Sequence, residues 1–465
     1  MGRGPGDARG PLAGGIPTAR SAGTAAGSRG VSHYRDRVDE SKIRVGVLGC
    51  GNVGAALIQL IEDRGDDIVA RTGLRLEVTR VAVRNVAKAR PVELADGVAT
   101  HDAGALVDDP DVDVIVEVIG GIEPARTLTL DALKAGKPVV SANKELLASM
   151  GAEIFDAADA AGVDILFEAA VAGAIPLIRP LRESLAGERI TRVMGIVNGT
   201  TNFILTRMTE DGASYQEALA EAQSLGYAER DPTADVEGFD AGAKAAIIAM
   251  IAFGARVVAG DVYHEGISGI TAADIAFARH LGYVVKLLAV VEDIDGEIAV
   301  RVHPAMVPAA HPLASVRDSF NAVFIEGDAV GELMLYGRGA GGFPTASAVL
   351  GDLIDAAVNL RKGSSAHIGR LGPARIRPID EVRSGYYLNV EVFDRPGVLA
   401  TVAGVFGEHG VSIRSMEQEG LGDEARLIFI THEAYERDVA ATLHDLKNLD
   451  VVGRVGSVLR VVGDS

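Results

Sequence analysis

The chain has 465 residues, of which 48% are hydrophobic, and its 64 acidic against 45 basic residues give a formal charge of −19 at pH 7. This length predicts two or three domains, each large enough for a core of its own. The acidic excess argues against nucleic acids and anionic membranes as partners, and no apolar run reaches the roughly 18 residues that a membrane-spanning helix needs. Small polar metabolites are therefore the expected ligands.

A single cysteine, Cys50, excludes an internal disulfide framework and is typical of a protein in a reducing cytoplasm. Residues 1–40 are rich in Gly, Ala, Arg and Pro and show no helical or strand period, so we expect a disordered tail there. Their arginines have two interpretations, an organelle transit peptide or an upstream choice of start codon. The glycines and prolines disfavour the amphipathic helix of a transit peptide and favour the second interpretation.

A glycine-rich loop follows the first predicted strand. Residues 43–48 (IRVGVL) predict a buried strand and residues 55–62 a helix, and GCGNVG between them matches the GxGxxG pattern of dinucleotide-binding folds. There the first glycine allows a tight turn, the second lets a pyrophosphate approach, and the third lets the helix pack on the strand. The helix amino terminus then presents N–H groups to the phosphates. The expected cofactor contacts are Gly49, Gly51, Asn52, Val53 and Gly54.

Residues 76–83 predict a second strand, and Arg84 follows it where NAD-dependent enzymes usually carry Asp or Glu. An arginine there can bind the 2′-phosphate of NADP, which favours NADP(H). Alternatively, Arg84 is a solvated loop charge, so the cofactor is expected to be NADP or NAD.

Further strands are predicted at residues 112–118 and 138–141, with a helix near 124–135 between them. This alternation predicts a doubly wound parallel sheet, which binds ligands at the carboxyl ends of its strands. Gly120, Gly121, Asn143 and Lys144 lie at those ends. Lys144 is either a charge at a helix start or a contact to the substrate or nicotinamide.

The lone thiol restricts the chemistry. Cys50 lies inside the glycine loop and is not presented to a substrate carbonyl, so a thioester mechanism is excluded. The mechanism that remains is direct hydride transfer between a nicotinamide and a carbonyl or alcohol, assisted by a general acid or base.

The best candidate for that acid or base lies in residues 226–244 (GYAERDPTADVEGFDAGAK). Residues 245–255 contain no ionisable side chain, so a helix running through them is expected to be buried. Asp240 and Lys244 are one helical turn apart and share a face. They are either a solvated ion pair or a buried pair in which the pKa of the lysine is adjusted for proton transfer.

Several ordered motifs resemble those of homoserine dehydrogenases: SANKELLA (141–148), FEAAVAGAIP (167–176), GIVNGTTNFIL (195–205) and GRGAGGFPTASAVLGDL (337–353). The resemblance runs from about Lys42 to the carboxyl end. It implies an NAD(P)H-dependent enzyme that interconverts L-aspartate 4-semialdehyde and L-homoserine, in threonine and methionine biosynthesis. It also implies a homodimer or homotetramer.

The resemblance assigns roles residue by residue. Lys244 corresponds to the catalytic proton donor, with Asp235 as an acid close to it. Glu229 and Asp240 correspond to ligands of the substrate ammonium group, and Lys144 to a lysine between cofactor and substrate. Gly226 and Gly341 correspond to positions that line the cofactor. A monovalent cation, Na⁺ or K⁺, is implied near Glu168, with the carbonyls of Val171, Gly173 and Ile175 as its ligands.

After a helix near residues 345–360 and a polar Gly/Pro-rich stretch, the chain predicts a strand-helix-strand-strand-helix-strand order. This module, with its DRPG turn at 394–397, resembles an ACT domain. The resemblance and the implied pathway motivate feedback regulation by L-threonine, and an assembly domain without a ligand is the alternative.

The expected architecture is α/β, with a Rossmann-type doubly wound parallel sheet, an α+β catalytic and dimerisation domain, and a ferredoxin-like ACT domain. Two other functions compete with this one, a catalytically silent amino-acid sensor and a reductase of a different semialdehyde. The expected segments are a tail (1–40), a dinucleotide-binding domain (41–150), a substrate and dimerisation domain (151–342), a helix returning to the first domain (343–362), a linker (363–384) and the ACT domain (385–465).

Overall fold

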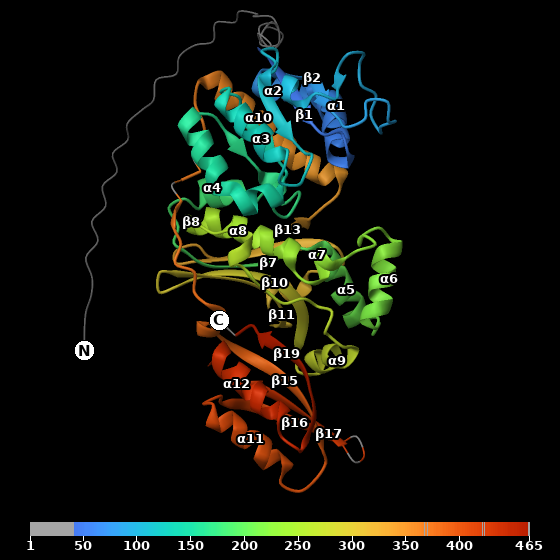
Figure 1. Cartoon of the computed structure of the whole chain (residues 1–465), viewed down its shortest axis with the longest axis vertical. Coiled ribbons are helices and arrows are strands. Elements are labelled where there is room, and N and C mark those ends of the chain that lie inside the picture. The colour runs from blue at the N-terminus through green and yellow to red at the C-terminus, as the bar shows by residue number, and fades with distance from the viewer. Residues whose placement is uncertain (1–40, 367, 370, 421, 423, 464–465) are drawn as a thin grey trace, which may run out of the picture. The chain divides into compact units, whose positions relative to one another are not determined.

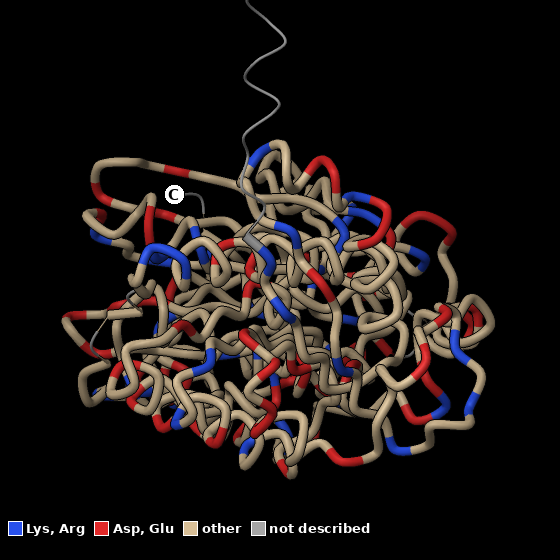
Figure 2. Tube along the Cα trace, turned by 90° about the horizontal axis from the view of Figure 1, so that it is seen from above, with Lys and Arg blue, Asp and Glu red and all other residues tan. Residues whose placement is uncertain are grey.

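The computed structural model of the chain describes residues 41–463 apart from positions 367, 370, 421 and 423 (Figure 1). The tail expected at residues 1–40 lies outside the described residues. Within the described part, no helix combines the length and the hydropathy that crossing a bilayer requires. Acidic and basic residues are interspersed along the described chain (Figure 2).

The first domain contains a parallel six-stranded sheet in the order β3-β2-β1-β4-β5-β6, which confirms the predicted doubly wound fold. Its strands are β1 (Ser41–Leu48), β2 (Leu74–Ala82), β3 (Ala99–Thr100), β4 (Val114–Glu117), β5 (Val139–Ser141) and β6 (Ile165–Leu166). The domain boundary expected at residue 150 falls inside a helix, and β6 comes from residues beyond it. A two-residue strand is too short to produce a periodic pattern.

Helices cover both faces of this sheet. Alternate strand residues face opposite layers, so Val114 and Val116 pack with α1 (Asn52–Thr72) and α10 (Gly342–Lys362), whereas Ile115 packs on the other side. That side carries α2 (Ala103–Asp108), α3 (Ala125–Lys134) and α4 (Lys144–Ala161). The late helix α10 thus returns to the first domain and contacts α1.

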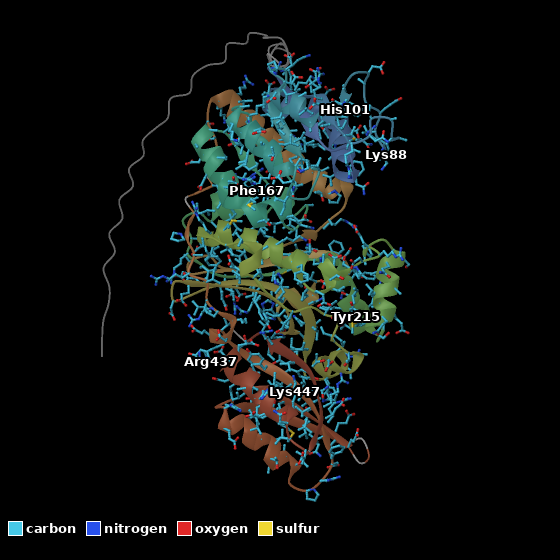
Figure 3. The ribbon with its side chains drawn as sticks, in the orientation of Figure 1. Lys88, His101, Phe167, Tyr215, Arg437 and Lys447 are labelled. Carbon is cyan, nitrogen blue, oxygen red and sulfur yellow. The ribbon has the colours of Figure 1, made fainter. Side chains whose placement is uncertain are left out.

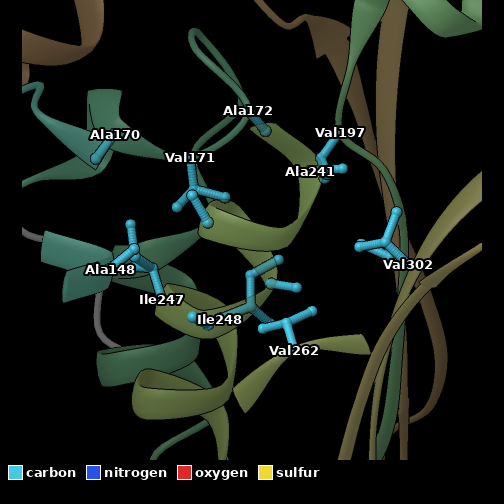
Figure 4. Close-up of a cluster of buried hydrophobic side chains, with 14 of the residues drawn as sticks. Ala148, Ala170, Val171, Ala172, Val197, Ala241, Ile247, Ile248, Val262 and Val302 are labelled. Atoms are coloured by element: carbon cyan, nitrogen blue, oxygen red, sulfur yellow. The ribbon is translucent and has the colours of Figure 1, made fainter. Parts of the chain in front are cut away.

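The second domain is built on antiparallel strands in the order β13-β12-β7-β10-β11. They are β7 (Ile190–Ile196), β10 (Tyr283–Ile294), β11 (Glu297–Pro308), β12 (Phe320–Gly327) and β13 (Gly331–Arg338). The apolar helix α8 (Phe239–Phe253) lies between β10 and β11 on one side and α4 on the other. Ile247 and Ile248 of α8 share a buried cluster with Val302 of β11 (Figure 4). This helix therefore links the catalytic sheet to the dinucleotide-binding domain.

The carboxyl-terminal module has the predicted element order, with strands arranged β19-β15-β17-β16. Its elements are β15 (Arg383–Phe393), α11 (Val398–Glu408), β16 (Ile413–Gly420), β17 (Glu424–Thr431), β18 (Ala434–Tyr435), α12 (Glu436–Lys447) and β19 (Val452–Val461). One sheet face packs on α11 and α12, for example through Phe406 and Phe429, whose ring centroids lie 4.7 Å apart.

Two connections between the modules were not expected. Strand β19 pairs in parallel with β11, so that the catalytic and ACT strands form one eleven-stranded sheet. The stretch expected to be a linker is held by backbone hydrogen bonds, because β14 (Gly372–Pro373) pairs with β8 (Ala255–Arg256) and Ile298 N donates to Arg375 O at 2.8 Å. Residues 372–377 therefore lie against the catalytic domain.

Candidate active site

The glycine-rich loop follows β1 and leads into α1, whose amino-terminal cap is Gly51. Gly49 has a φ of 105°, and a Cβ on it would lie 2.9 Å from Val118 O. A Cβ on Gly54 would lie 2.3 Å from Gly49 O, so only glycine allows this helix to begin so close to the strand. No atom lies within 4 Å of the Cβ position of Gly51. The loop thus leaves open space where a pyrophosphate would meet the helix amino terminus.

The buried carboxylate of Glu117 accepts hydrogen bonds from groups at two neighbouring strand ends. Glu117, at the end of β4, is fully buried and accepts a hydrogen bond from Ser141 Oγ at 2.7 Å. Its other oxygen accepts the backbone N–H groups of Ile119 and Gly120 at 3.0 and 3.3 Å. Burial raises the pKa of Glu117. Sequence reasoning missed this residue, although an acid inside the apolar run VIVEV was a signal for it.

The loop that Glu117 supports is joined to the start of α4 through Asn143. The Asn143 side chain donates to Gly121 O at 2.6 Å and accepts from Leu146 N at 3.1 Å, which caps α4. Lys144 is the first residue of that helix. A cavity of about 330 Å³ opens here, and its lining includes Gly120, Gly121, Lys144, Gly173, Lys244 and Gly339. A single cavity is thus lined by Gly120, Lys144, Gly173 and Lys244, whose expected roles are cofactor binding, substrate binding, cation binding and proton donation.

Asp240 lies between two lysines. Lys144 Nζ is 2.5 Å from Asp240 Oδ1, and Lys244 Nζ is 2.6 Å from Asp240 Oδ2. The side chains of Asp240 and Lys244 are only 7% and 11% exposed, so the interpretation as a solvated ion pair was wrong. The helix explains this burial, because α8 begins after Gly238, with a φ of 84°, and continues into an apolar segment.

The charged groups in this cluster shift the pKa values of their neighbours. Although burial opposes ionisation of Asp240, the two ammonium groups outweigh it and hold the pKa of Asp240 well below its usual range. Burial acts to lower the pKa of Lys144, but the charge of Asp240 outweighs this effect and raises it. Burial raises the pKa of the neighbouring Asp235, and Asp240 acts in the same direction.

Asn198 joins the two acids of this site. It caps α5 (Gly199–Glu210), and its Nδ2 donates to Asp235 Oδ1 at 2.7 Å and to Asp240 Oδ2 at 2.9 Å. The neighbouring Val197 O accepts a hydrogen bond from Lys244 Nζ at 2.7 Å. Sequence reasoning included Asn198 in a motif but gave it no role, because its partners are 37 and 42 residues away.

Comparison with known proteins decides the family. Residues 49–168 match the family profile described as "Homoserine dehydrogenase, NAD binding domain", residues 176–354 match "Homoserine dehydrogenase", and residues 386–464 match "ACT domain". The chain is 52% identical to the homoserine dehydrogenase of Corynebacterium glutamicum over 431 residues, which cover 91% of this chain and 96% of that protein. The chain belongs to the homoserine dehydrogenase family.

Solved structures agree with this assignment. A homoserine dehydrogenase from Thiobacillus denitrificans superposes with a TM-score of 0.86 at 42% identity, over 91% of this chain and 99% of that one. A hyperthermophilic archaeal homoserine dehydrogenase in complex with NADPH has a TM-score of 0.58 at 30% identity, over 68% of this chain and 98% of that one. The protein is thus an NAD(P)-dependent oxidoreductase that acts on a CH–OH group, with a carboxyl-terminal ACT domain.

Other expected contacts of this homoserine dehydrogenase lie outside the lysine cluster. Glu229 is exposed, and its described hydrogen bond uses its backbone oxygen, which accepts from Gln223 Nε2 at 3.1 Å. Gly226, with a φ of 75°, follows α6 (Tyr215–Ser224). Arg84 is exposed beyond β2 and has no side-chain partner among the described residues. Gly341 caps α10, and the next residue, Gly342, approaches the glycine-rich loop.

The segment expected to hold a monovalent cation follows Phe167 (Figure 3). Phe167 is buried, and its ring stacks on that of Phe155 with the centroids 5.2 Å apart. The Glu168 carboxylate is buried and accepts backbone N–H groups from Leu177, Ile178 and Arg179, the last two at 2.7 and 2.9 Å. The expected carbonyl donors belong to Val171, Gly173 and Ile175, and all three of these residues are buried.

The local backbone accounts for the small residues of this segment. Ala172 and Gly173 both have positive φ, at 56° and 57°. A Cβ on Gly173 would lie 2.2 Å from Gly339 O, so the loop packs tightly there. Carbonyl oxygens beside a buried carboxylate are the donors that hard cations prefer. The residues present therefore fit a monovalent cation, whereas the described residues contain no cluster of three or more His, Cys, Asp or Glu side chains suited to a metal ion.

Proposed function

We propose that this chain interconverts L-aspartate 4-semialdehyde and L-homoserine with NAD(P)H, and that Lys244 exchanges the proton at the reacting oxygen. The observation that carries this proposal is the hydrogen bonding of Lys244. An ammonium group has three N–H donors, and Val197 O and Asp240 Oδ2 accept two of them at 2.7 and 2.6 Å. The third is left for an oxygen in the cavity that Lys244 lines.

The chemistry needs a proton donor at that place. When bound, the nicotinamide supplies the hydride for reduction or accepts it in the reverse direction. The aldehyde oxygen gains negative charge during reduction, and a proton from Lys244 Nζ converts it to the hydroxyl group. In the reverse direction the neutral amine of Lys244 accepts the hydroxyl proton. Asp240 stays ionised, because its pKa lies well below the working pH, and keeps a negative charge beside the lysine.

We assign the substrate contacts to Lys144, Glu229 and Asp240, with Asp235 as the supporting acid. Both oxygens of Asp240 already form ion pairs with the lysines, so Asp240 orients these two lysines in addition to its substrate contact. Glu229 has no side-chain partner among the described residues, which leaves its carboxylate for the substrate ammonium group. Lys144 Nζ retains donors for an oxygen of the substrate or the nicotinamide amide.

The decisive experiment replaces Lys244 with alanine. Lys244→Ala is expected to lower kcat by at least about 100-fold, the usual share of a general acid, with cofactor affinity unchanged. Lys134→Ala is the control, because Lys134 is 71% exposed on α3. A Lys244→Ala enzyme with normal turnover would refute the proton-transfer role.

We propose that the cofactor is NADP(H), because Arg84 follows β2 at the strand end where a 2′-phosphate would lie. Its exposure and lack of a partner among the described residues leave the guanidinium available. Arg84→Glu should lower kcat/KM for NADPH about tenfold and leave that for NADH almost unchanged. Equal effects on both cofactors would identify Arg84 as an ordinary loop charge.

We propose a monovalent cation, Na⁺ or K⁺, at Glu168 and the carbonyls of Val171, Gly173 and Ile175. Support comes from the buried carboxylate beside a tight loop of positive-φ residues. Activity and the unfolding temperature should rise when tetramethylammonium chloride is replaced by NaCl or KCl at constant ionic strength. Identical results in the three salts would argue against the site.

We propose that the ACT domain binds L-threonine and that this binding inhibits the enzyme, which acts in threonine and methionine biosynthesis. We also propose that the enzyme is a homodimer or homotetramer. Truncation near Arg361 would test this poorly, because it would remove β19 from β11 and take the buried Tyr387 and Leu459 away from the catalytic residues that share their core. Threonine titration of the full chain is cleaner, and light scattering on a sizing column gives the assembly. An ACT module used only for assembly would leave activity unchanged by threonine.

A further inference from the structure

The side-chain amide of Asn198 stands between two carboxylates of the site. Its Nδ2 atom donates one hydrogen bond to Asp235 Oδ1 at 2.7 Å and one to Asp240 Oδ2 at 2.9 Å. Asn198 is only 5% exposed. The two acids come from different helices, α7 (Thr233–Val236) and α8. One amide group thus uses each of its two hydrogens to hold a different helix.

Hydrogen bonds to Thr201 fix the orientation of this amide. Asn198 Oδ1 accepts from Thr201 N at 2.9 Å and from Thr201 Oγ1 at 3.0 Å. A flipped amide would place its NH₂ group against the Thr201 backbone N–H and its oxygen against two carboxylates. Only the observed orientation satisfies all four partners. The cap of α5 therefore points a pair of donors at Asp235 and Asp240.

Asp235 depends on this contact more than Asp240 does. Asp240 is compensated by Lys144 and Lys244. Among the described side chains, Asn198 is the one that donates a hydrogen bond to Asp235. The charged groups that act on Asp235 are Asp240, which opposes its ionisation, and the two lysines, which favour it. Without the amide, Asp235 would be a half-buried carboxylate beside another, with no hydrogen-bond donor.

We propose that Asn198 is a positioning residue of the dehydrogenase reaction. It holds Asp235 and Asp240 at a fixed separation and so keeps Asp240 in the orientation that binds both lysines. The inference rests on the proposed place of Lys244 at the reacting oxygen. Displacing a reacting group by about 1 Å can cost on the order of 100-fold in rate, so a shared donor at this position bears directly on turnover.

The test separates the donor function of Asn198 from its helix-capping function. Asn198→Asp is nearly isosteric and retains an oxygen that caps α5, but it lacks both N–H donors and adds a third negative charge. We expect kcat/KM to fall at least about 30-fold. The acid limb of its pH profile should move to higher pH, because a proton binds more readily to Asp235 beside an added charge.

Two further variants isolate a purely structural effect. Asn198→Ala removes cap and donors together, and we expect it to lose both activity and thermal stability. Ser214→Ala removes the cap of α6, whose Ser214 Oγ accepts from Glu217 N at 3.3 Å, and should lower only stability. Asn198→Asp with normal kcat/KM and an unshifted pH profile would overturn the inference.

The failures of the two proposals are distinguishable. Normal turnover in Lys244→Ala would refute the proton-transfer role, whatever Asn198→Asp does. An inactive Lys244→Ala beside a fully active Asn198→Asp would leave the function standing and refute the positioning role of Asn198. Reduced activity in both variants, with the acid limb of the pH profile moved to higher pH in Asn198→Asp, supports both.

Discussion

Arg460 holds Glu265 with both terminal guanidinium nitrogens, at 2.7 and 3.0 Å. Arg460 lies in β19 of the ACT domain, and Glu265 follows β9 (Tyr263–His264) of the catalytic domain. Two residues beyond Glu265, Ile267 N donates to Val236 O at 2.8 Å, at the end of the helix that carries Asp235. A short covalent and hydrogen-bonded path thus joins the last ACT strand to the acidic segment of the active site.

If the proposed threonine inhibition operates, this path predicts that Glu265→Gln weakens it without destroying activity. The amide keeps the shape of Glu265 but removes its charge, while Arg460 retains Glu436 at 2.8 Å. We expect the threonine concentration for half-inhibition to rise at least about fivefold, the lower end of ordinary allosteric coupling. Basal kcat should change little.

The control for this prediction is Arg437→Gln. Arg437 is the second residue of the ACT helix α12 (Figure 3), and its described contacts are Asp438 and the face of Tyr435. It has no described contact with the catalytic domain, so its loss should leave the threonine titration unchanged. A Glu265→Gln enzyme with the same threonine response as the parent would show that coupling takes another route.

Asp240→Asn should be more damaging than its small change in shape implies. The substitution leaves the buried Lys244 without its counter-ion, and breaking a buried pair typically costs about 3–5 kcal/mol. The partly exposed Lys144 loses the same partner. We expect kcat/KM to fall by at least about 100-fold. Because Asp240 raises the pKa of Lys144, that pKa should fall in the variant.

The pH dependence distinguishes this mechanism from simple unfolding. A protein that has lost its fold would be inactive at every pH. A folded Asp240→Asn enzyme should instead retain some activity whose alkaline limit lies at lower pH than in the parent. Circular dichroism establishes folding, and kcat/KM is measured across the pH range. An unchanged alkaline limit would contradict the role of Asp240 as counter-ion.

Local parts of this site could be predicted from sequence. The positive φ of Gly49 and the close approach of Gly54 to Gly49 O are steric limits that act within six residues. Asp240 and Lys244 are one turn apart, and the uncharged residues after them predict burial. Each of these relationships depends on a regular backbone geometry, so residue spacing was sufficient to find it.

The remaining contacts depend on how elements pack. Lys144 meets Asp240 because α4 and α8 contact each other, and no spacing along the chain encodes that crossing. The pairing of Ala305 with Arg460 joins two strand edges whose own patterns predict only strands. Likewise, the polar composition of residues 363–384 predicts a linker, but backbone hydrogen bonds hold such a segment irrespective of its side chains.

Glu117→Gln should weaken cofactor binding more than turnover. The carboxylate accepts from Ser141 Oγ, Ile119 N and Gly120 N, whereas a glutamine offers only one accepting oxygen. One buried donor left unsatisfied costs about 1–3 kcal/mol, so KM for the cofactor should rise about tenfold. Glu62→Gln, exposed on α1, is the control. Fluorescence titration with NADPH measures the effect, and unchanged affinity would refute a supporting role for Glu117.

Lys286 on β10 gives a prediction about stability. The lysine is 2% exposed, and its Nζ donates to Asn202 Oδ1 at 3.0 Å and to Val316 O, both uncharged acceptors. Burial without an ion pair lowers the pKa of Lys286 to about 8. The unfolded chain therefore binds a proton that the folded chain lacks between pH 8 and the ordinary lysine pKa of 10.5.

The contribution of Lys286 to the free energy of unfolding must consequently increase as the pH rises from 8 towards 10.5, by about 1.4 kcal/mol per pH unit. Lys286→Met removes the titration and keeps a long apolar side chain. The unfolding temperature of the parent, relative to Lys286→Met, should thus rise by about 2–3 °C between pH 8 and 10. Differential scanning fluorimetry of both proteins in matched buffers measures this difference. A constant or falling difference would mean that Lys286 titrates as an ordinary solvated lysine.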